Sequence, residues 1–304
     1  MTDSQSWNSG RSPEDPSFSC DFSFCSLGFS IRTNSVEVYK GARRFFEHFP
    51  PAAGSADERS LILRVQSDGW LYDFPLAGEH HIRTGDLPYI FVLLDAHVLN
   101  HFRSSSTQHW VMHAGMVARA GKGILLPGGT THGKSTLTAM LVHEGLDYLG
   151  DEHVILDREG SLAVRGFPRP IVLREDSYEK IREIVPALEP VVPPLLIEGK
   201  GDFYIDPENL RPGSVAEQAE LLYIVFPHYA PDESPALVPI SKADAMVQLL
   251  RGFLHFKHFR AAAIEGLSNI VDRVPCYSLI TGQYKETVSL ISELLSSNDP
   301  QTDA

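Results

Sequence analysis

The chain has 304 residues, with 39 Asp and Glu against 26 Lys and Arg, and a formal charge of −13. This acidic balance argues against general binding to nucleic acid or to an anionic membrane, because both attract a surplus of basic residues. No apolar run reaches the roughly 18 residues of a membrane-spanning helix, and no secretory signal is visible. The three cysteines cannot all pair with one another and lack zinc-ligand spacing, so we expect reduced thiols in a cytoplasmic protein.

The first part of the chain is read as a lead followed by a small domain. Residues 1–17 are rich in Ser, Asp, Asn and Pro, which is the composition of a disordered segment. From 18 to 106 the pattern is mostly strand-like, with a β-rich run at 60–65, and a helix is expected from about Pro88 to Phe102. We therefore predict a small β-rich N-terminal domain over 18–106.

A second pattern begins at residue 107 and favours a larger domain that extends to 297. A strand over 110–119, a tight turn at 120–122 and a returning strand over 123–126 lead to a Gly-rich stretch and a helix over 135–144. Beyond this helix we expect strands at 147–150, 154–157, 221–226 and 276–280, loops over 190–215, and helices from Ser241 towards 254, over 260–271 and over 284–295. Residues 298–304 are read as a loose tail, and no internal repeat is present.

The segment from Gly128 to Ser135 matches G-x-x-x-x-G-K-[ST], the phosphate-binding loop (P-loop). An apolar strand precedes the loop and an amphipathic helix follows it. Gly128 and Gly133 allow the backbone to curl, so that successive N–H groups can point at phosphate oxygens. Lys134 can reach the β- and γ-phosphates, and Ser135 can offer its hydroxyl to Mg²⁺. The motif predicts a nucleoside-triphosphate site, with candidate nucleotide-binding residues Gly128, Gly129, Thr130, Thr131, His132, Gly133, Lys134, Ser135 and Thr136.

Two acidic residues, Asp151 and Glu152, follow the strand after the loop's helix, where P-loop proteins place a metal-binding or water-orienting acid. Neighbouring side chains of an extended segment point to opposite faces, so we expect the two acids to have separate roles. His113 lies on the strand before the hairpin and could lie beside Asp151. An imidazole there would orient the carboxylate and change its proton affinity, although a lone histidine on a strand is more often a core residue.

The segments at 113–117, 120–123, 128–135 and 145–152 together resemble HPr kinase/phosphorylase and its related serine kinases. The resemblance covers about 107–296, and the stretches at 167–170, 241–245 and 254–257 are similar to the related kinases rather than to HPr kinase itself. It implies an α/β fold with a P-loop kinase core of the HPr kinase/phosphoenolpyruvate carboxykinase type. It further implies an ATP-dependent serine kinase with ATP and Mg²⁺ as cofactors. Relatives often form oligomers, so a homo-oligomer is left open.

The resemblance also implies roles for single residues. Asp151 matches the acid that accepts the proton of the substrate hydroxyl, and His113 matches its partner. Ser135 matches the magnesium ligand of the loop, and Glu152 matches a second acid, for which we expect a part in metal binding. Catalytic residues are therefore expected at Asp151, His113 and Lys134, with metal ligands at Ser135 and Glu152.

The acceptor is less well defined. The favoured acceptor is a protein or peptide that carries a serine, and Arg165, Arg169 and Lys257 are candidates for binding it. The acidic-apolar run that ends in Arg-Gly and supplies a further magnesium-binding Glu in true HPr kinases is not recognisable here. Neither HPr as the substrate nor the reverse phosphorolysis therefore follows. A small-molecule kinase and a regulatory nucleotide-binding module remain alternatives, whereas a mechanical or transport ATPase fits less well.

Overall fold

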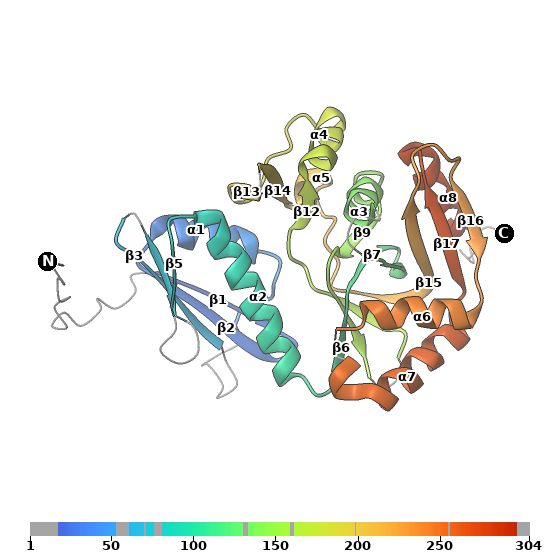
Figure 1. The fold of residues 1–304 in the computed structure, drawn as a ribbon, viewed down its shortest axis with the longest axis horizontal. Coiled ribbons are helices and arrows are strands. Elements are labelled where there is room, and N and C mark those ends of the chain that lie inside the picture. The colour runs from blue at the N-terminus through green and yellow to red at the C-terminus, as the bar shows by residue number, and fades with distance from the viewer. Residues whose placement is uncertain are drawn as a thin grey trace, which may run out of the picture. The chain divides into compact units, whose positions relative to one another are not determined.

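The computed structural model describes residues 18–52, 61–69, 71–75, 81–129, 133–158, 161–197, 199–254 and 256–296 (Figure 1). The predicted disordered lead and loose tail lie outside these ranges. The chain divides into two compact units. The first holds the described residues up to Arg44 together with Pro50–Val98, and the second holds Phe45–Phe49 and the chain from Leu99 onward.

The first unit is a five-stranded sheet in the order β1-β2-β3-β4-β5, with α1 and most of α2. Its elements are β1 (Phe18–Phe24), β2 (Leu27–Thr33), α1 (Val36–Phe45), β3 (Leu61–Ser67), β4 (Tyr72–Pro75), β5 (His81–Thr84) and α2 (Leu87–Ser105). Gly41 of α1 packs so closely on α2 that an added Cβ would lie 2.1 Å from the Phe91 ring. The strands and the long helix agree with the predicted β-rich pattern, whereas α1 was not predicted.

The second unit is built on a nine-stranded sheet with the main order β6-β10-β11-β15-β8-β7-β9, and β17 and β16 continue from β15. β15 runs parallel to both β8 and β17, so the carboxyl ends of these three strands lie at one edge of the sheet. The strands are β6 (His109–Met112), β7 (Ala114–Arg119), β8 (Lys122–Pro127), β9 (Asp147–Gly150), β10 (Val154–Asp157), β11 (Ala163–Gly166), β15 (Gln218–Tyr229), β16 (Ala236–Pro239) and β17 (Cys276–Thr281).

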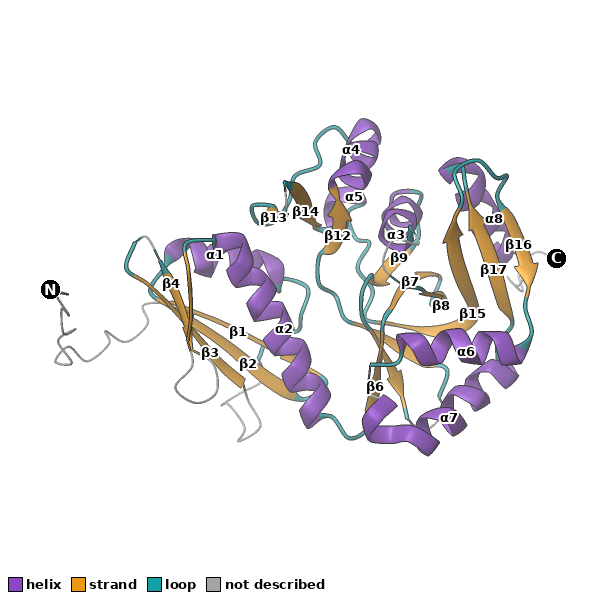
Figure 2. Cartoon of the chain, viewed as in Figure 1, coloured by secondary structure: helices purple, strands orange, loops and turns teal. Residues whose placement is uncertain are grey.

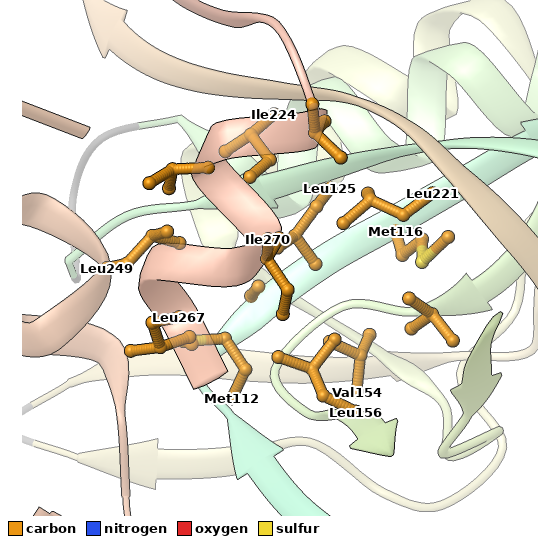
Figure 3. Packing of buried hydrophobic residues seen from close by; sticks show 14 of the residues in the cluster. Met112, Met116, Leu125, Val154, Leu156, Leu221, Ile224, Leu249, Leu267 and Ile270 are labelled. Atoms are coloured by element: carbon orange, nitrogen blue, oxygen red, sulfur yellow. The ribbon is translucent and has the colours of Figure 1, made fainter. Parts of the chain in front are cut away.

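Helices cover both faces of this sheet (Figure 2). Alternate residues of one strand serve the two sides, since Met116 packs towards α6 and α7 while Val117 packs towards α3 and α8. In Figure 3, Leu267 and Ile270 of α7 lie close to the sheet residues Met112 and Leu125. The helices are α3 (Lys134–His143), α6 (Lys242–Gly252), α7 (Phe256–Arg273) and α8 (Tyr284–Ser296). Three layers of this kind form the α/β core that the sequence predicts.

A three-stranded sheet has the order β12-β14-β13, and two of its strands, β13 and β14, lie in the segment 190–215 that we expected to be loops. Its strands are β12 (Ile171–Arg174), β13 (Leu195–Ile197) and β14 (Lys200–Ile205), accompanied by α4 (Glu175–Ile184) and α5 (Pro207–Leu210). β14 pairs antiparallel with both other strands, and Ile171 and Ile205 are buried. The loop prediction for 190–215 is therefore wrong at β13, β14 and α5.

The hairpin before the P-loop differs from the prediction at one residue. Ala120 and Gly121 both have positive φ values, 50° and 75°, which is the backbone of a two-residue hairpin turn. The strand predicted over 110–119 is interrupted at His113, between β6 and β7. The backbone N–H of His113 donates instead to the carbonyl oxygen of Gly252 in α6, at 2.8 Å.

The segment Phe45–Phe49 packs inside the second unit, although it lies among residues of the first in the sequence. The Phe45 ring lies 5.3 Å from that of Tyr204, and the Phe49 ring meets Phe167 edge-on at 5.1 Å. His48 Nε2 lies 2.8 Å from Asp206 Oδ1. Hydrophobic and polar contacts together therefore attach this segment to β14 and to the chain around Phe167.

Two negative expectations concern membranes and cysteines. Within the described ranges, no helix combines the length and the apolar character needed to cross a bilayer. Cys276 is a buried thiol in β17, and Cys20 is a partly buried thiol in β1.

Candidate nucleotide-binding site

The segment that matches the P-loop motif follows β8 and leads into α3. Gly133, the residue before the first turn of α3, has φ 76°, a left-handed conformation that glycine adopts without strain. The first helical hydrogen bond runs from the N–H of Leu137 to the carbonyl oxygen of Gly133, at 2.9 Å. Thr130, Thr131 and His132 lie outside the described residues, so their predicted contacts with a nucleotide stay predictions. Free N–H groups in the first turn of a helix are suited to binding phosphate.

Lys134 is buried, with 4% of its surface exposed. Nζ lies 3.4 Å from the carbonyl oxygen of Gly128 and 3.1 Å from Nε2 of His113. Close packing keeps the stem in place, because a Cβ on Gly115 of β7 would lie 3.5 Å from Lys134 Cγ. These two hydrogen-bond partners are neutral, while the carboxyl groups of Asp151 and Glu152 are close enough for the Lys134 charge to act on their pKa in the lowering direction.

His113 has a different carboxylate partner from the one predicted. Its Nε2 lies 2.9 Å from Oε2 of Glu152, so the predicted pairing of His113 with Asp151 is wrong. The strand alternation correctly separates the two acids, but it does not tell which of them faces the ring. A single ring nitrogen cannot donate to Glu152 and accept from Lys134 in the same tautomer. Nε2 therefore has two competing partners, one anionic and one cationic.

The environment of Glu152 favours its charged form. Burial by itself would raise the pKa of Glu152, but the hydrogen bond with His113 and the charges of Lys134 and Arg169 outweigh it and hold the pKa well below its usual range. The side chain is 30% exposed and lines the cavity at the P-loop. A charged carboxylate is thus accessible from the cavity that Lys134 also lines.

Asp151 has no exposed surface. Burial raises its pKa to about 6 against the opposing charge of Lys134, and the charge of Glu152 adds to the rise. The side chain of Ser135 lies close enough to act on the pKa of Asp151 in the lowering direction, and Oδ2 accepts from the backbone N–H of Val172 at 3.4 Å. Oδ1 is buried and makes no hydrogen bond within the described part of the chain. The predicted role of Asp151 as the base is not tested by these contacts.

The predicted magnesium ligands Ser135 and Glu152 both line the cavity, and this assignment stays a prediction; Asp151 is a further candidate ligand beside Ser135. Mg²⁺ binds one or two protein oxygens and takes its other ligands from phosphates and water. The hydroxyl of Ser135 and the unpartnered Oδ1 of Asp151 supply such oxygens at the start of α3. Across the described ranges no three His, Cys, Asp or Glu side chains form a metal cluster, so phosphate oxygens would have to complete the coordination.

A cavity of about 330 Å³ opens at the loop. Gly129, Gly133, Lys134 and Ser135 line it from the loop, and other lining residues are Glu152, Arg174, Lys180, Asp202, Tyr229 and Tyr284. A hollow of about 440 Å³ elsewhere in the second unit is lined by Trp110, Arg158 and Glu265, among others, but by no P-loop residue. The chemistry of the lining residues therefore selects the smaller cavity as the candidate site.

The predicted acceptor-binding residues occupy different places. Arg169 is buried, and its charge lowers the pKa of both Glu152 and His153. Arg165 is exposed on β11. The pKa of His109 is lowered mainly by burial of the ring, and the charge of Arg165 lowers it further. The backbone of Lys257 belongs to α7, while its side chain lies outside the described part. Binding of an acceptor by these three residues stays a prediction.

Sequence reasoning missed a row of rings behind the site. His153 lies 6.2 Å from His113 and 6.0 Å from Phe167, measured between ring centres, and Phe167 in turn meets Phe49. Burial lowers the pKa of His153 well below its usual value, and the charge of Arg169 adds to this effect. In the sequence, only its position directly after Glu152 could have indicated that His153 lies near the site. Nothing in the sequence indicated that Phe49 packs against this row of rings.

Comparison with known proteins gives little further support. No protein-family model matches the chain, and no curated protein matches it. A solved structure of the Hpr(Ser) kinase/phosphatase from Coxiella burnetii is similar over 63% of this chain and 95% of that chain, with 15% identity and a TM-score of 0.31. A similarity this weak does not assign a reaction.

Proposed function

We propose that the protein is a kinase that transfers the γ-phosphoryl group of ATP to the serine hydroxyl of a protein or peptide. The contact of His113 with both Glu152 and Lys134, beside the P-loop, supports this proposal most strongly. A loop that only binds nucleotide does not need a carboxylate held by a histidine next to its phosphate-binding lysine. The cytoplasmic location expected from the sequence belongs to the same proposal.

Binding of the triphosphate depends on Lys134 and the loop amides. In the proposed complex the Lys134 ammonium leaves the His113 ring and binds the β- and γ-phosphates, while the N–H groups at the start of α3 bind phosphate oxygens. When Mg²⁺ is bound, it supplies positive charge to the same oxygens, and Ser135 and Asp151 are the residues that would hold it.

Glu152 is the base in this proposal, because it lines the cavity whereas Asp151 is fully buried. Glu152 accepts the proton of the acceptor hydroxyl, the hydroxyl oxygen forms a bond to the γ-phosphorus, and the bond from this phosphorus to the β-bridging oxygen breaks to release ADP. Entry of the phosphates raises the pKa of Glu152, since they add negative charge and take over Lys134. His113 is a positioning residue that holds the carboxylate in the direction of the acceptor.

The test is transfer of γ-labelled phosphate with Mg²⁺, first to a lysate of the source organism and then to a pool of its metabolites. Label on a protein or peptide, released as phosphoserine and lost in Lys134→Met, is the expected result. Label in metabolites alone would replace the proposed acceptor by a small molecule. Tight ATP binding without any transfer would contradict the kinase and indicate a regulatory nucleotide-binding module.

A further inference from the structure

Two tyrosine rings lie beside the P-loop and have no part in the proposed transfer. Tyr229 is the last residue of β15 and Tyr284 is the first of α8. Their ring centres are 6.5 Å apart and their planes differ by 13°, so the two aromatic faces are nearly parallel. Both residues are partly exposed, and both line the cavity that Lys134 and Ser135 also line. We refer to Tyr229 and Tyr284 as the tyrosine pair.

The sheet places the tyrosine pair next to the loop. β8 and β15 run parallel, so β15 ends, at Tyr229, on the same edge of the sheet at which β8 leads into the P-loop. A Cβ built on Gly133 would lie 3.4 Å from Cβ of Tyr229, which shows how closely the loop approaches this residue. Burial raises the pKa of Tyr284, and the side chain of Thr136, in the first turn of α3, lies close enough to act on it in the opposite direction. Each tyrosine therefore lies near a different part of the loop region.

Charged residues line the same cavity. Burial raises the pKa of Asp202. The charge of Arg174 opposes this rise, and the charge of Glu152 adds to it, so both charged groups lie near Asp202. Near the tyrosine pair the charged group is Lys180, whose Nζ lies 5.9 Å from the Tyr229 ring centre. The cavity thus offers charged lining residues, Glu152 and Asp202 among them, and an aromatic set formed by the tyrosine pair.

We infer that the tyrosine pair is the stacking platform for the base of the nucleotide whose triphosphate binds the P-loop. The inference rests on the proposed function, which places the γ-phosphate at Lys134 and Glu152. The nucleoside is attached to the opposite end of the phosphate chain, so it must lie away from Glu152, and the aromatic set provides flat apolar faces there. Stacking on tyrosine accepts any base, because every base has a π face. Lys180 lies where it can meet the α-phosphate or the polar edge of the base.

A second hollow beside the loop is less suited to a base. It measures about 170 Å³ and is lined by His113, Gln248 and Arg251, among others. Its phenylalanine, Phe226, is 4% exposed and belongs to the hydrophobic core, so it offers no free face for stacking. The tyrosine pair is the better platform of the two.

The test compares two ligands on the full chain by calorimetry with Mg²⁺: ATP, and inorganic tripolyphosphate, which has no base. Tyr229→Leu and Tyr284→Leu should weaken ATP binding by about five- to a hundredfold and leave tripolyphosphate binding unchanged, given the usual contribution of base–aromatic stacking. Tyr229→Phe and Tyr284→Phe should restore most of the affinity, because the rings remain. Tyr277→Leu, on β17 but outside the cavity lining, is the matched control and should affect neither ligand.

Equal weakening of ATP and tripolyphosphate, or no weakening of either, would overturn the platform while leaving the proposed kinase intact. Failure of the wild-type protein to bind both ligands would overturn the proposed function and the platform with it. If the leucine variants do not fold, the platform is tested on the wild-type protein by comparing its affinities for two ligands. ATP must then bind at least about fivefold more tightly than ribose 5-triphosphate, which lacks only the base, and equal affinity rejects the platform.

Discussion

His113 Nε2 lies 2.9 Å from Oε2 of Glu152 and 3.1 Å from Nζ of Lys134, so one imidazole nitrogen lies between a carboxylate and an ammonium group. Only one of these groups can use the nitrogen at a time. If phosphate draws the ammonium away, the ring can donate to Glu152 without competition. The arrangement thereby connects occupancy of the loop with the orientation of the proposed base.

The first prediction concerns Lys134. Lys134→Met should reduce ATP affinity at least about tenfold, since a charge-assisted contact with phosphate contributes about 1.5–3 kcal/mol. Lys122→Met is the matched control, because Lys122 is exposed on β8 and pairs with Glu220 away from the cavity. The measurement is titration calorimetry with Mg-ATP. Similar affinities for both variants would show that Lys134 does not bind the phosphates.

The second prediction separates the two acids. Glu152→Gln should lower the transfer rate about 10²- to 10⁴-fold, the usual contribution of a general base, with ATP affinity nearly unchanged. Asp151→Asn should instead raise the Mg²⁺ concentration needed for half-maximal rate. Rates measured over a magnesium series distinguish the two effects. Glu144→Gln, an exposed change at the end of α3, should behave like the wild type. The reverse assignment of the two phenotypes would restore Asp151 as the base.

The third prediction is a pH effect of His113. The hydrogen bond from His113 lowers the pKa of Glu152 against the effect of burial, so His113→Ala should raise this pKa. A base must be deprotonated to act, and the acid limb of the rate profile should therefore move to higher pH. His113→Asn, which can still donate a hydrogen bond, should move it less. A uniform loss of rate at every pH would indicate a purely structural role for the histidine.

The fourth prediction concerns stability. Burial would lower the pKa of His48, but the hydrogen bond and charge of Asp206, with Glu47 and Glu208, raise it overall. The protonated ring therefore stabilises the fold fully below its unfolded pKa near 6.5, and this contribution is lost as the pH rises through the raised value. Urea unfolding of wild type and His48→Gln should differ most at pH 5.5–6 and converge at alkaline pH. A difference that is constant with pH would exclude this ion pair as its source.

The fifth prediction tests the packing of α7. A Cβ on Gly266 would lie 1.9 Å from the ring of Trp110, which is 2% exposed, so Gly266→Ala should destabilise the protein by about 1–3 kcal/mol despite alanine's better helix propensity. The measurement is thermal or urea unfolding. Glu265→Ala, at the exposed neighbouring position of the same helix, should have a small effect. Equal stability of Gly266→Ala and the wild type would show that α7 can shift without cost.

Local patterns account for much of the site and for less of the fold. The P-loop, its helix and the hairpin were predictable because glycine spacing and apolar periodicity are properties of neighbouring residues. β14 was missed because it pairs with β12, a segment distant in the sequence, and the short β13, which pairs with β14, was missed because Pro and Gly surround it. α1 was missed because its valines favour a strand, whereas Ser35 caps the helix through a bond from the N–H of Val38, at 3.2 Å. The partner of His113 depends on how β9 ends, which alternation alone does not determine.

The five residues Phe45–Phe49 have a consequence for how the protein can be divided. Phe49 supports Phe167, which lies against His153, the neighbour of the proposed base. A fragment that starts at residue 107, at the apparent beginning of the P-loop part, would lack this support and would uncover Phe167 and Tyr204. Such a fragment should aggregate or lose activity even though it retains every residue of the proposed active site. Linking a peptide with the sequence of residues 45–49 covalently to the fragment should rescue it.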